Sequence, residues 1–206
     1  MLERFRVGWA KAMTPPARLF IALHLTPDMI TWAGTFFTVA AALVCFPQGW
    51  LWQGVLIITA FIFSDGIDGQ MARMLGRKST WGAFLDSSLD RIGDGAVFGG
   101  IVLYYAGPGH SQLWAGIALG ALVMGQVTSY VKARGEALGV QVRGGLAARA
   151  DRLVLLLVAA FFTGVFNLAW LLPLALSWGF FASTVTVGQR MVQVAHAGPG
   201  RDDPTV

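Results

Sequence analysis

Residues 65–90 read DGIDGQMARMLGRKSTWGAFLDSSLD and set four aspartates, Asp65, Asp68, Asp86 and Asp90, between long apolar segments. If both halves of this stretch are helical, Asp65 and Asp68 share one helix face, and Asp86 and Asp90 share a face of the next helix. Carboxylates that meet in an apolar setting repel one another unless cations lie among them. Hard divalent ions prefer such oxygen ligands, so the stretch predicts a metal site for Mg²⁺, with Mn²⁺ as the alternative ion.

Small residues accompany these acids, and they allow helix backbones and a bulky phosphate-bearing ligand to approach closely. They are Gly66, Gly69, Ala72, Gly82, Ala83 and Ser87. A second interpretation needs no metal, because Arg73, Arg77 and Arg91 could form salt bridges with the aspartates at the membrane edge. Asp94 lies one turn beyond Asp90, and we expect it to pair with Arg91 or a neighbouring residue rather than to bind metal.

The composition of the chain is that of an integral membrane protein. Of its 206 residues, 55% are hydrophobic and only 13% are charged. The net charge is +4, but the basic residues do not gather on one polar domain, so nucleic acid is not expected as a partner. A few membrane spans would use most of this length, which predicts one compact unit with short linkers.

Charged residues alternate with three long charge-free segments. Asp, Glu, Lys and Arg are missing from residues 29–64, 95–131 and 153–189. If each segment crosses the membrane, turns and begins to return, all charged clusters lie on one side, which the positive-inside rule makes cytoplasmic. The expected spans are residues 28–47, 51–75, 82–106, 112–136, 150–168 and 170–194. This topology predicts a multi-pass protein of the cell membrane with both termini in the cytoplasm and with Trp114 and Trp170 at the outer interface.

The N-terminal segment has the pattern of a helix that lies on the membrane surface. Leu2, Phe5 and Trp9 recur at helical spacing, and Pro15 and Pro16 are expected to interrupt the helix. We expect three parts in the chain: an interfacial amphipathic helix over residues 1–16, a six-helix domain over 17–195 and a disordered tail over 196–206. The predicted fold is an all-α integral membrane protein with six transmembrane helices plus the N-terminal interfacial helix.

The aspartates follow the pattern Asp65-x2-Asp68-Gly69-x2-Ala72-Arg73-x8-Gly82-x3-Asp86-x3-Asp90. This pattern resembles the signature of the CDP-alcohol phosphatidyltransferases at every position. The resemblance implies a CDP-linked donor such as CDP-diacylglycerol and two metal ions. One ion would be held by Asp65, Asp68 and Asp86 and the other by Asp65, Asp86 and Asp90. It also implies substitution at phosphorus with release of CMP, in which Asp90 takes the proton of the acceptor hydroxyl or orients that hydroxyl.

The same resemblance implies donor-binding residues around the aspartates. Gly69 and Arg73 match positions that hold the nucleotide and its phosphates, and Ser79 matches a further donor contact. Asp28 and Thr31 match positions at the nucleotide. Structural roles are also open, because Thr26-Pro27-Asp28 is a typical helix start and Ser79 could cap the following helix.

Four cations are candidates for binding the acceptor. Lys132, Arg134, Arg152 and Arg190 fall at similar predicted depth on the cytoplasmic side. They resemble the phosphate-binding residues of the bacterial phosphatidylinositol phosphate synthases, a branch of the family, which implies inositol 3-phosphate as the acceptor and a homodimeric assembly. The positive-inside rule alone also predicts cations here, and glycerol 3-phosphate, the acceptor for phosphatidylglycerophosphate synthesis, would need a similar cluster.

Acidic residues within the bilayer are also expected in membrane cation transporters or cation-binding proteins. Such a protein needs charged or polar groups across the full membrane thickness. The predicted outer half of every span lacks formal charge. The sequence therefore favours an enzyme that works among membrane lipids at the cytoplasmic side.

Overall fold

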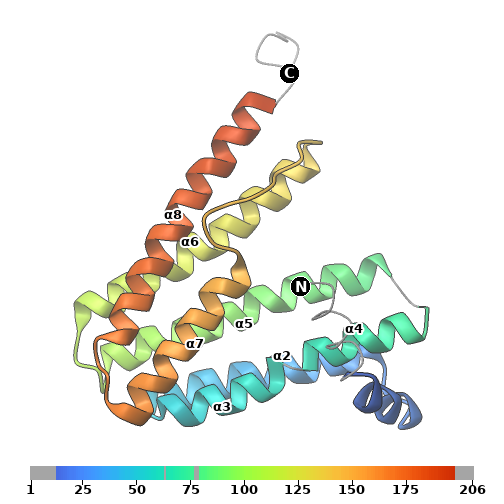
Figure 1. Ribbon diagram of the computed structural model, residues 1–206, viewed down its shortest axis with the longest axis horizontal. Coiled ribbons are helices and arrows are strands. Elements are labelled where there is room, and N and C mark those ends of the chain that lie inside the picture. Colours follow the sequence, from blue (N-terminus) through green and yellow to red (C-terminus); the bar gives the residue numbers. More distant parts are fainter. Residues whose placement is uncertain (1–12, 63, 77–78, 198–206) are drawn as a thin grey trace, which may run out of the picture. The chain divides into compact units, whose positions relative to one another are not determined.

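The computed structural model describes residues 13–62, 64–76 and 79–197, without the side chains of Ser64 and Asp65. These residues are helical wherever they are regular, and none of them forms a strand. The helices are α2 (Pro27–Cys45), the short 3-10 helix η1 (Phe46–Gln48), α3 (Leu51–Ile62), α4 (Ser64–Met74), α5 (Thr80–Ala106), α6 (Gln112–Ala137), α7 (Arg149–Phe166) and α8 (Leu171–Ala197) (Figure 1). The chain divides at Gly100 into two compact units, and α5 runs from the first into the second. The predicted all-α fold is confirmed.

The first unit is built around α2. Thr26 caps α2 by accepting a hydrogen bond from the Met29 N–H at 3.3 Å, and Pro27 occupies the first turn, as the sequence predicts. Helix α2 packs along α3 and α4 (Figure 1). The predicted span over residues 51–75 corresponds to α3 and α4, and the stretch Leu51–Met74 is long and apolar enough to cross a membrane.

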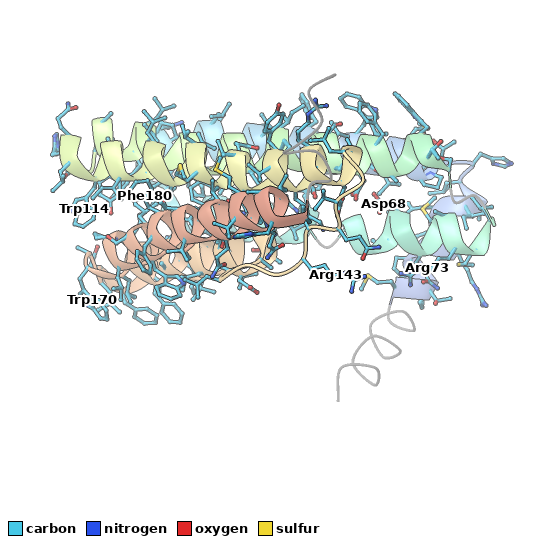
Figure 2. All side chains as sticks on the ribbon, turned by 90° about the horizontal axis from the view of Figure 1, so that it is seen from above. Asp68, Arg73, Trp114, Arg143, Trp170 and Phe180 are labelled. Carbon is cyan, nitrogen blue, oxygen red and sulfur yellow. The ribbon has the colours of Figure 1, made fainter. Side chains whose placement is uncertain are left out.

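The second unit is built around α8, which packs along both α6 and α7. The loop between α6 and α7 is fastened to α8, because the Leu146 N–H donates to Thr186 Oγ1 at 3.0 Å. Figure 2 shows Trp114 and Trp170 at one end of this unit and Arg143 toward the other end. Aromatic side chains and cations are therefore separated along the helices, as expected for a membrane protein.

In the described part of the chain, four stretches are long and apolar enough to be candidate membrane spans: residues 27–48, 51–74, 112–137 and 171–197. Helices α5 and α7 carry charged residues in their N-terminal halves, including Asp90 and Arg152. Large apolar side chains such as Phe36, Leu113 and Trp170 are exposed on the chain, a surface that suits contact with lipid. The structure thus supports a membrane protein with at least the four spans that meet this criterion.

The predicted interfacial helix falls mainly on residues 1–12, which lie outside the described residues. Residues 13–22 are helical, and this helix includes Pro15 and Pro16, where the sequence predicts an interruption. Proline lacks the N–H donor but has a φ angle near the helical value, so a helix can include it where that hydrogen bond is not needed. Most of the predicted tail, residues 198–206, is likewise outside the described part.

Candidate active site

A cavity of about 710 Å³ opens in the first unit among α2, α4 and α5. This volume is within the usual range for small-molecule sites. It is lined by Thr26, Pro27, Asp28, Thr31, Asp68, Gly69, Ala72, Arg73, Ser79, Gly82, Ala83 and Asp86. All five residues that the sequence predicts at the donor line this one cavity, together with two of the four predicted metal ligands.

Two helix N-termini contribute to the cavity wall. Thr26 and Ser79 precede α2 and α5, and Ser79 Oγ accepts a hydrogen bond from the Gly82 N–H at 2.9 Å. The capping role expected for Ser79 is therefore confirmed. Helix N-termini carry partial positive charge and attract phosphate groups. Arg73, which Figure 2 shows with Asp68 on α4, adds a full positive charge.

Asp68 is the buried acid of the cavity, with 8% of its surface exposed. The Thr31 hydroxyl lies 2.5 Å from Asp68 Oδ2 and donates to it, which joins α2 to α4. Asp86 and Asp90 lie near enough for their negative charges to act on Asp68. Thr31, which is predicted to meet the nucleotide, lines this cavity, and its hydroxyl has a carboxylate partner there.

The acids of α5 differ in their ion pairs. Arg91 Nη2 lies 3.7 Å from Asp90 and 3.5 Å from Asp94, so the predicted pairing of Asp94 with Arg91 is confirmed. The contact between Arg91 and Asp90 is one of the salt bridges expected in the interpretation that needs no metal. Asp68 and Asp86, by contrast, form no ion pair with any Lys or Arg in the described part of the chain.

The carboxylates at the cavity are of a kind that suits a hard divalent cation. Asp68, Asp86 and Asp90 offer carboxylate oxygens, the negative charges of Asp86 and Asp90 act on Asp68, and a cation would relieve this repulsion. The fourth predicted ligand, Asp65, has its side chain outside the described residues. Within the residues that could be searched, no three His, Cys, Asp or Glu side chains form a complete metal cluster.

One neighbour of the donor cavity has no signal in the sequence. Trp81 Nε1 donates to Asp28 Oδ2 at 3.2 Å, which connects the start of α5 to the start of α2. The two residues are separated by 53 positions, and neither helical period nor capping pattern relates them. Gly69 faces open space, because a Cβ atom added there would meet no atom within 4 Å. A ligand can therefore approach the backbone of α4 at this glycine.

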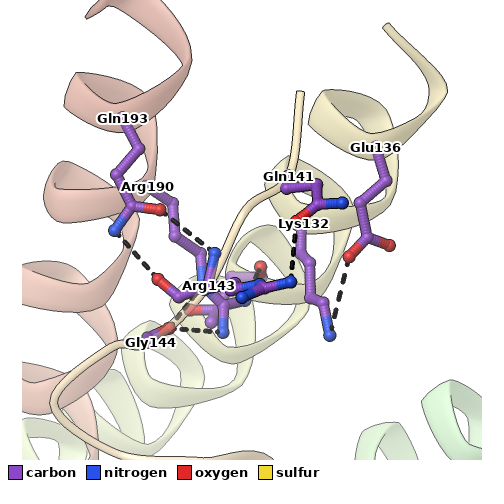
Figure 3. A network of polar contacts seen from close by, with 8 residues as sticks. Lys132, Glu136, Gln141, Arg143, Gly144, Arg190 and Gln193 are labelled. Carbon is purple, nitrogen blue, oxygen red and sulfur yellow. Dashed lines mark hydrogen bonds and ion pairs between the residues drawn. The ribbon is translucent and has the colours of Figure 1, made fainter. Parts of the chain in front are cut away.

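The four predicted acceptor cations all belong to the second unit, but their surroundings differ. Lys132 and Arg134 are exposed near the end of α6, and Lys132 pairs with Glu136 at 3.8 Å (Figure 3). Arg190 has backbone partners on α6 and on the loop that follows it. Its guanidinium donates to the backbone oxygen of Thr128 at 2.7 Å and to that of Gly144 at 3.1 and 3.3 Å (Figure 3).

Arg152 is the buried member of this set, with 7% of its surface exposed. Its Nη1 donates to Ser183 Oγ at 2.7 Å. The Thr128 hydroxyl donates to the backbone oxygen of Ser183 at 3.4 Å, and Thr128 also accepts from Arg190. Arg152 and Arg190 are therefore connected through the contact between α6 and α8, whereas Lys132 and Arg134 lie on exposed turns.

Comparisons with known proteins agree with this site. Residues 24–188 match the family model for CDP-alcohol phosphatidyltransferase. The chain is 53% identical over 204 residues to a phosphatidylinositol phosphate synthase of Cutibacterium acnes, covering 96% of this chain and 99% of that protein. It is 45% identical over 212 residues to the synthase of Streptomyces avermitilis, covering 100% and 87% of the two chains.

Solved structures agree with the fold over nearly the whole chain. The crystal structure of the Mycobacterium tuberculosis phosphatidylinositol phosphate synthase with CDP-DAG bound matches with a TM-score of 0.88 at 37% identity, covering 95% of this chain and 99% of that chain. The same enzyme in complex with manganese and citrate matches with a TM-score of 0.86, covering 94% and 93%. The family model matches most of the chain, the relatives match nearly the whole of it, and the aspartate pattern is complete. The chain therefore belongs to the CDP-alcohol phosphatidyltransferase family.

Proposed function

We propose that this enzyme transfers the phosphatidyl group of CDP-diacylglycerol to 1D-myo-inositol 3-phosphate and releases CMP. The observation that carries the proposal is the identity of 53% with a phosphatidylinositol phosphate synthase over nearly the full length of both chains. The reaction forms a bond from the acceptor hydroxyl oxygen to the phosphorus of the phosphatidyl group. The bond from that phosphorus to CMP breaks, and CMP leaves as an anion.

The donor is proposed to occupy the cavity of the first unit. Asp28 would meet the nucleotide, and Arg73 and the backbone at Gly69 would hold the diphosphate. Ser79 combines its capping role with a place in the cavity wall, so it would present α5 to the phosphates. The positive helix ends and the guanidinium complement the charge of a diphosphate, which supports this assignment.

Two Mg²⁺ ions are proposed for the aspartates, the first held by Asp65, Asp68 and Asp86 and the second by Asp65, Asp86 and Asp90. The manganese-bound relative supports a divalent ion at this site. Such ions neutralise the diphosphate and stabilise the charge that develops on CMP. Asp90 would accept the proton from the acceptor hydroxyl as its oxygen attacks, or would orient that hydroxyl.

Thr31 is proposed to orient Asp68 rather than to bind the nucleotide. Thr31→Val keeps the shape of the side chain but removes the hydroxyl that donates to the buried carboxylate. We expect the concentration of Mg²⁺ needed for half-maximal CMP release to rise about 10- to 100-fold, as is usual for lost partners of metal ligands. Thr31→Ser should keep the wild-type value. Unchanged Mn²⁺ binding in Thr31→Val, measured by electron paramagnetic resonance, with a raised KM for CDP-diacylglycerol would instead assign Thr31 to the nucleotide.

Lys132, Arg134, Arg152 and Arg190 are proposed to bind the phosphate of the acceptor. Arg152 would be the fixed member, because it is buried and directed by Ser183. Arg190 would exchange at least one of its contacts with backbone carbonyls for the phosphate. Lys132 and Arg134 are exposed and can move toward an incoming anion. An acceptor without a phosphate would gain nothing from such a set.

The membrane arrangement is part of the proposal. Six transmembrane helices would be formed by α2, by α3 with α4, and by α5, α6, α7 and α8, preceded by an interfacial helix over residues 1–16. Both termini and the site would face the cytoplasm at the cell membrane, because Lys and Arg gather on that side. Residues 17–195 would form the catalytic domain of a homodimer, and residues 196–206 a disordered tail.

The test is CMP release by the purified chain in lipid nanodiscs with CDP-diacylglycerol and Mg²⁺. Inositol 3-phosphate, glycerol 3-phosphate and free inositol are supplied separately. We expect release with inositol 3-phosphate and little with the other two. Preference for glycerol 3-phosphate would assign the enzyme to phosphatidylglycerophosphate synthesis, and preference for free inositol would remove the role of the four cations.

A further inference from the structure

Arg152 is held in the second unit by contacts from both α6 and α8. We propose that Gly125 and Ser183 are positioning residues that set the direction of the Arg152 guanidinium and so fit the site to an acceptor that carries a phosphate. This inference rests on the proposed function, in which Arg152 binds the acceptor phosphate. Neither Gly125 nor Ser183 is charged, and neither belongs to the aspartate pattern.

Ser183 supplies an acceptor of defined orientation. The residue is 1% exposed, and its hydroxyl donates to the backbone oxygen of Gly179 at 2.6 Å. Because the hydroxyl proton is used in that bond, the oxygen lone pairs are available to Arg152 Nη1, which lies 2.7 Å away. Ser183 is neutral, so it orients the guanidinium without cancelling its positive charge. The remaining N–H groups of the planar guanidinium are then directed as well.

Gly125, on α6, leaves the space that the Arg152 guanidinium occupies. A Cβ atom built at Gly125 would lie 3.2 Å from Arg152 Nη1 and 3.8 Å from Cζ. The first distance is shorter than an ordinary van der Waals contact, so any larger residue would displace the guanidinium by a few tenths of an ångström or more. Glycine is unfavourable inside a helix, but at position 125 of α6 its missing Cβ leaves room for the Arg152 guanidinium.

Arginine binds phosphate through two parallel N–H···O bonds, and this recognition depends on the direction of the guanidinium plane. A small displacement of Arg152 should therefore weaken binding of the acceptor phosphate. The donor cavity is lined by residues between Thr26 and Asp86, none of which contributes to the setting of Arg152 described above. The expected change is thus confined to the acceptor.

The experiment compares Gly125→Ala and Ser183→Ala with Gly116→Ala, measured with Mg²⁺ in nanodiscs. Gly116 is the matched control because it lies in the same helix and a Cβ atom there would meet nothing within 4 Å. We expect both test variants to raise KM for inositol 3-phosphate about tenfold and to leave KM for CDP-diacylglycerol within about twofold. Gly116→Ala should match the wild type, and Ser183→Thr, which keeps the hydroxyl, should recover most of the affinity for the acceptor.

Direct binding of inositol 3-phosphate, measured by calorimetry on the same variants, should weaken in parallel with the rise in KM. If Gly125→Ala does not fold, Ser183→Ala alone tests the inference, because the Ser183→Ala substitution removes one oxygen atom and adds no atom that could clash. An unchanged acceptor KM in Ser183→Ala, or an equal rise in both KM values, would overturn the inference. Arg152→Ala distinguishes a failure of this inference from a failure of the proposed function. An unchanged KM for inositol 3-phosphate in Arg152→Ala would overturn the role of Arg152 in binding the acceptor phosphate.

Discussion

Asp86→Asn is expected to lower the rate of CMP release by about 10³-fold or more, because the substitution removes one charge from the proposed ligand set of both metal ions. Asp86 lines the donor cavity, and its charge acts on the buried Asp68. The side chain is exposed, so the amide should not disturb folding. The measurements are CMP release with saturating substrates and Mn²⁺ binding by electron paramagnetic resonance.

Asp94→Asn is the matched control for this variant. It makes the same acid-to-amide change two turns further along α5, where Asp94 pairs with Arg91 at 3.5 Å. Exposed or partly exposed ion pairs contribute little, and we expect CMP release within about threefold of the wild type. If Asp86→Asn kept more than about a tenth of the wild-type rate, Asp86 could not be a ligand shared by two ions.

Removal of divalent cations with EDTA should lower CMP release to the background, a loss of at least about 10³-fold, because the carboxylates alone cannot neutralise a diphosphate. Added Mg²⁺ should restore the rate fully, and Mn²⁺ should also support it. Titration of the metal-free protein with Mn²⁺ should give two ions per active site. EDTA already saturated with Mg²⁺ is the control, and it should have no effect.

A wild-type rate in the presence of EDTA would contradict the metal site and favour the interpretation in which the aspartates only form salt bridges. A single bound Mn²⁺ would retain metal dependence but contradict the proposed sharing of Asp65 and Asp86. Asp90→Asn adds a further distinction. We expect it to lose CMP release while keeping the ion that is assigned to Asp65, Asp68 and Asp86.

Most of the helical framework follows from local sequence. The predicted span 112–136 corresponds to α6 (Gln112–Ala137), and the predicted 28–47 to α2 (Pro27–Cys45). These limits depend on apolar length and on capping residues such as Thr26, which act within one turn of the chain. The predicted span 51–75 likewise corresponds to the apolar stretch Leu51–Met74, which contains α3 and α4.

The sequence by itself determined the helices, their caps and the residue types around the donor cavity, because helical period and capping relate residues only three or four positions apart. The tertiary structure decided which side chains meet. It directs Thr31 to Asp68, Trp81 to Asp28 and Arg152 to Ser183, across 37, 53 and 31 positions of the chain. It also gave Arg190 backbone partners on α6 and on the loop between α6 and α7. Such contacts depend on the rotation and axial shift of one helix against another, which are set by packing rather than by local sequence.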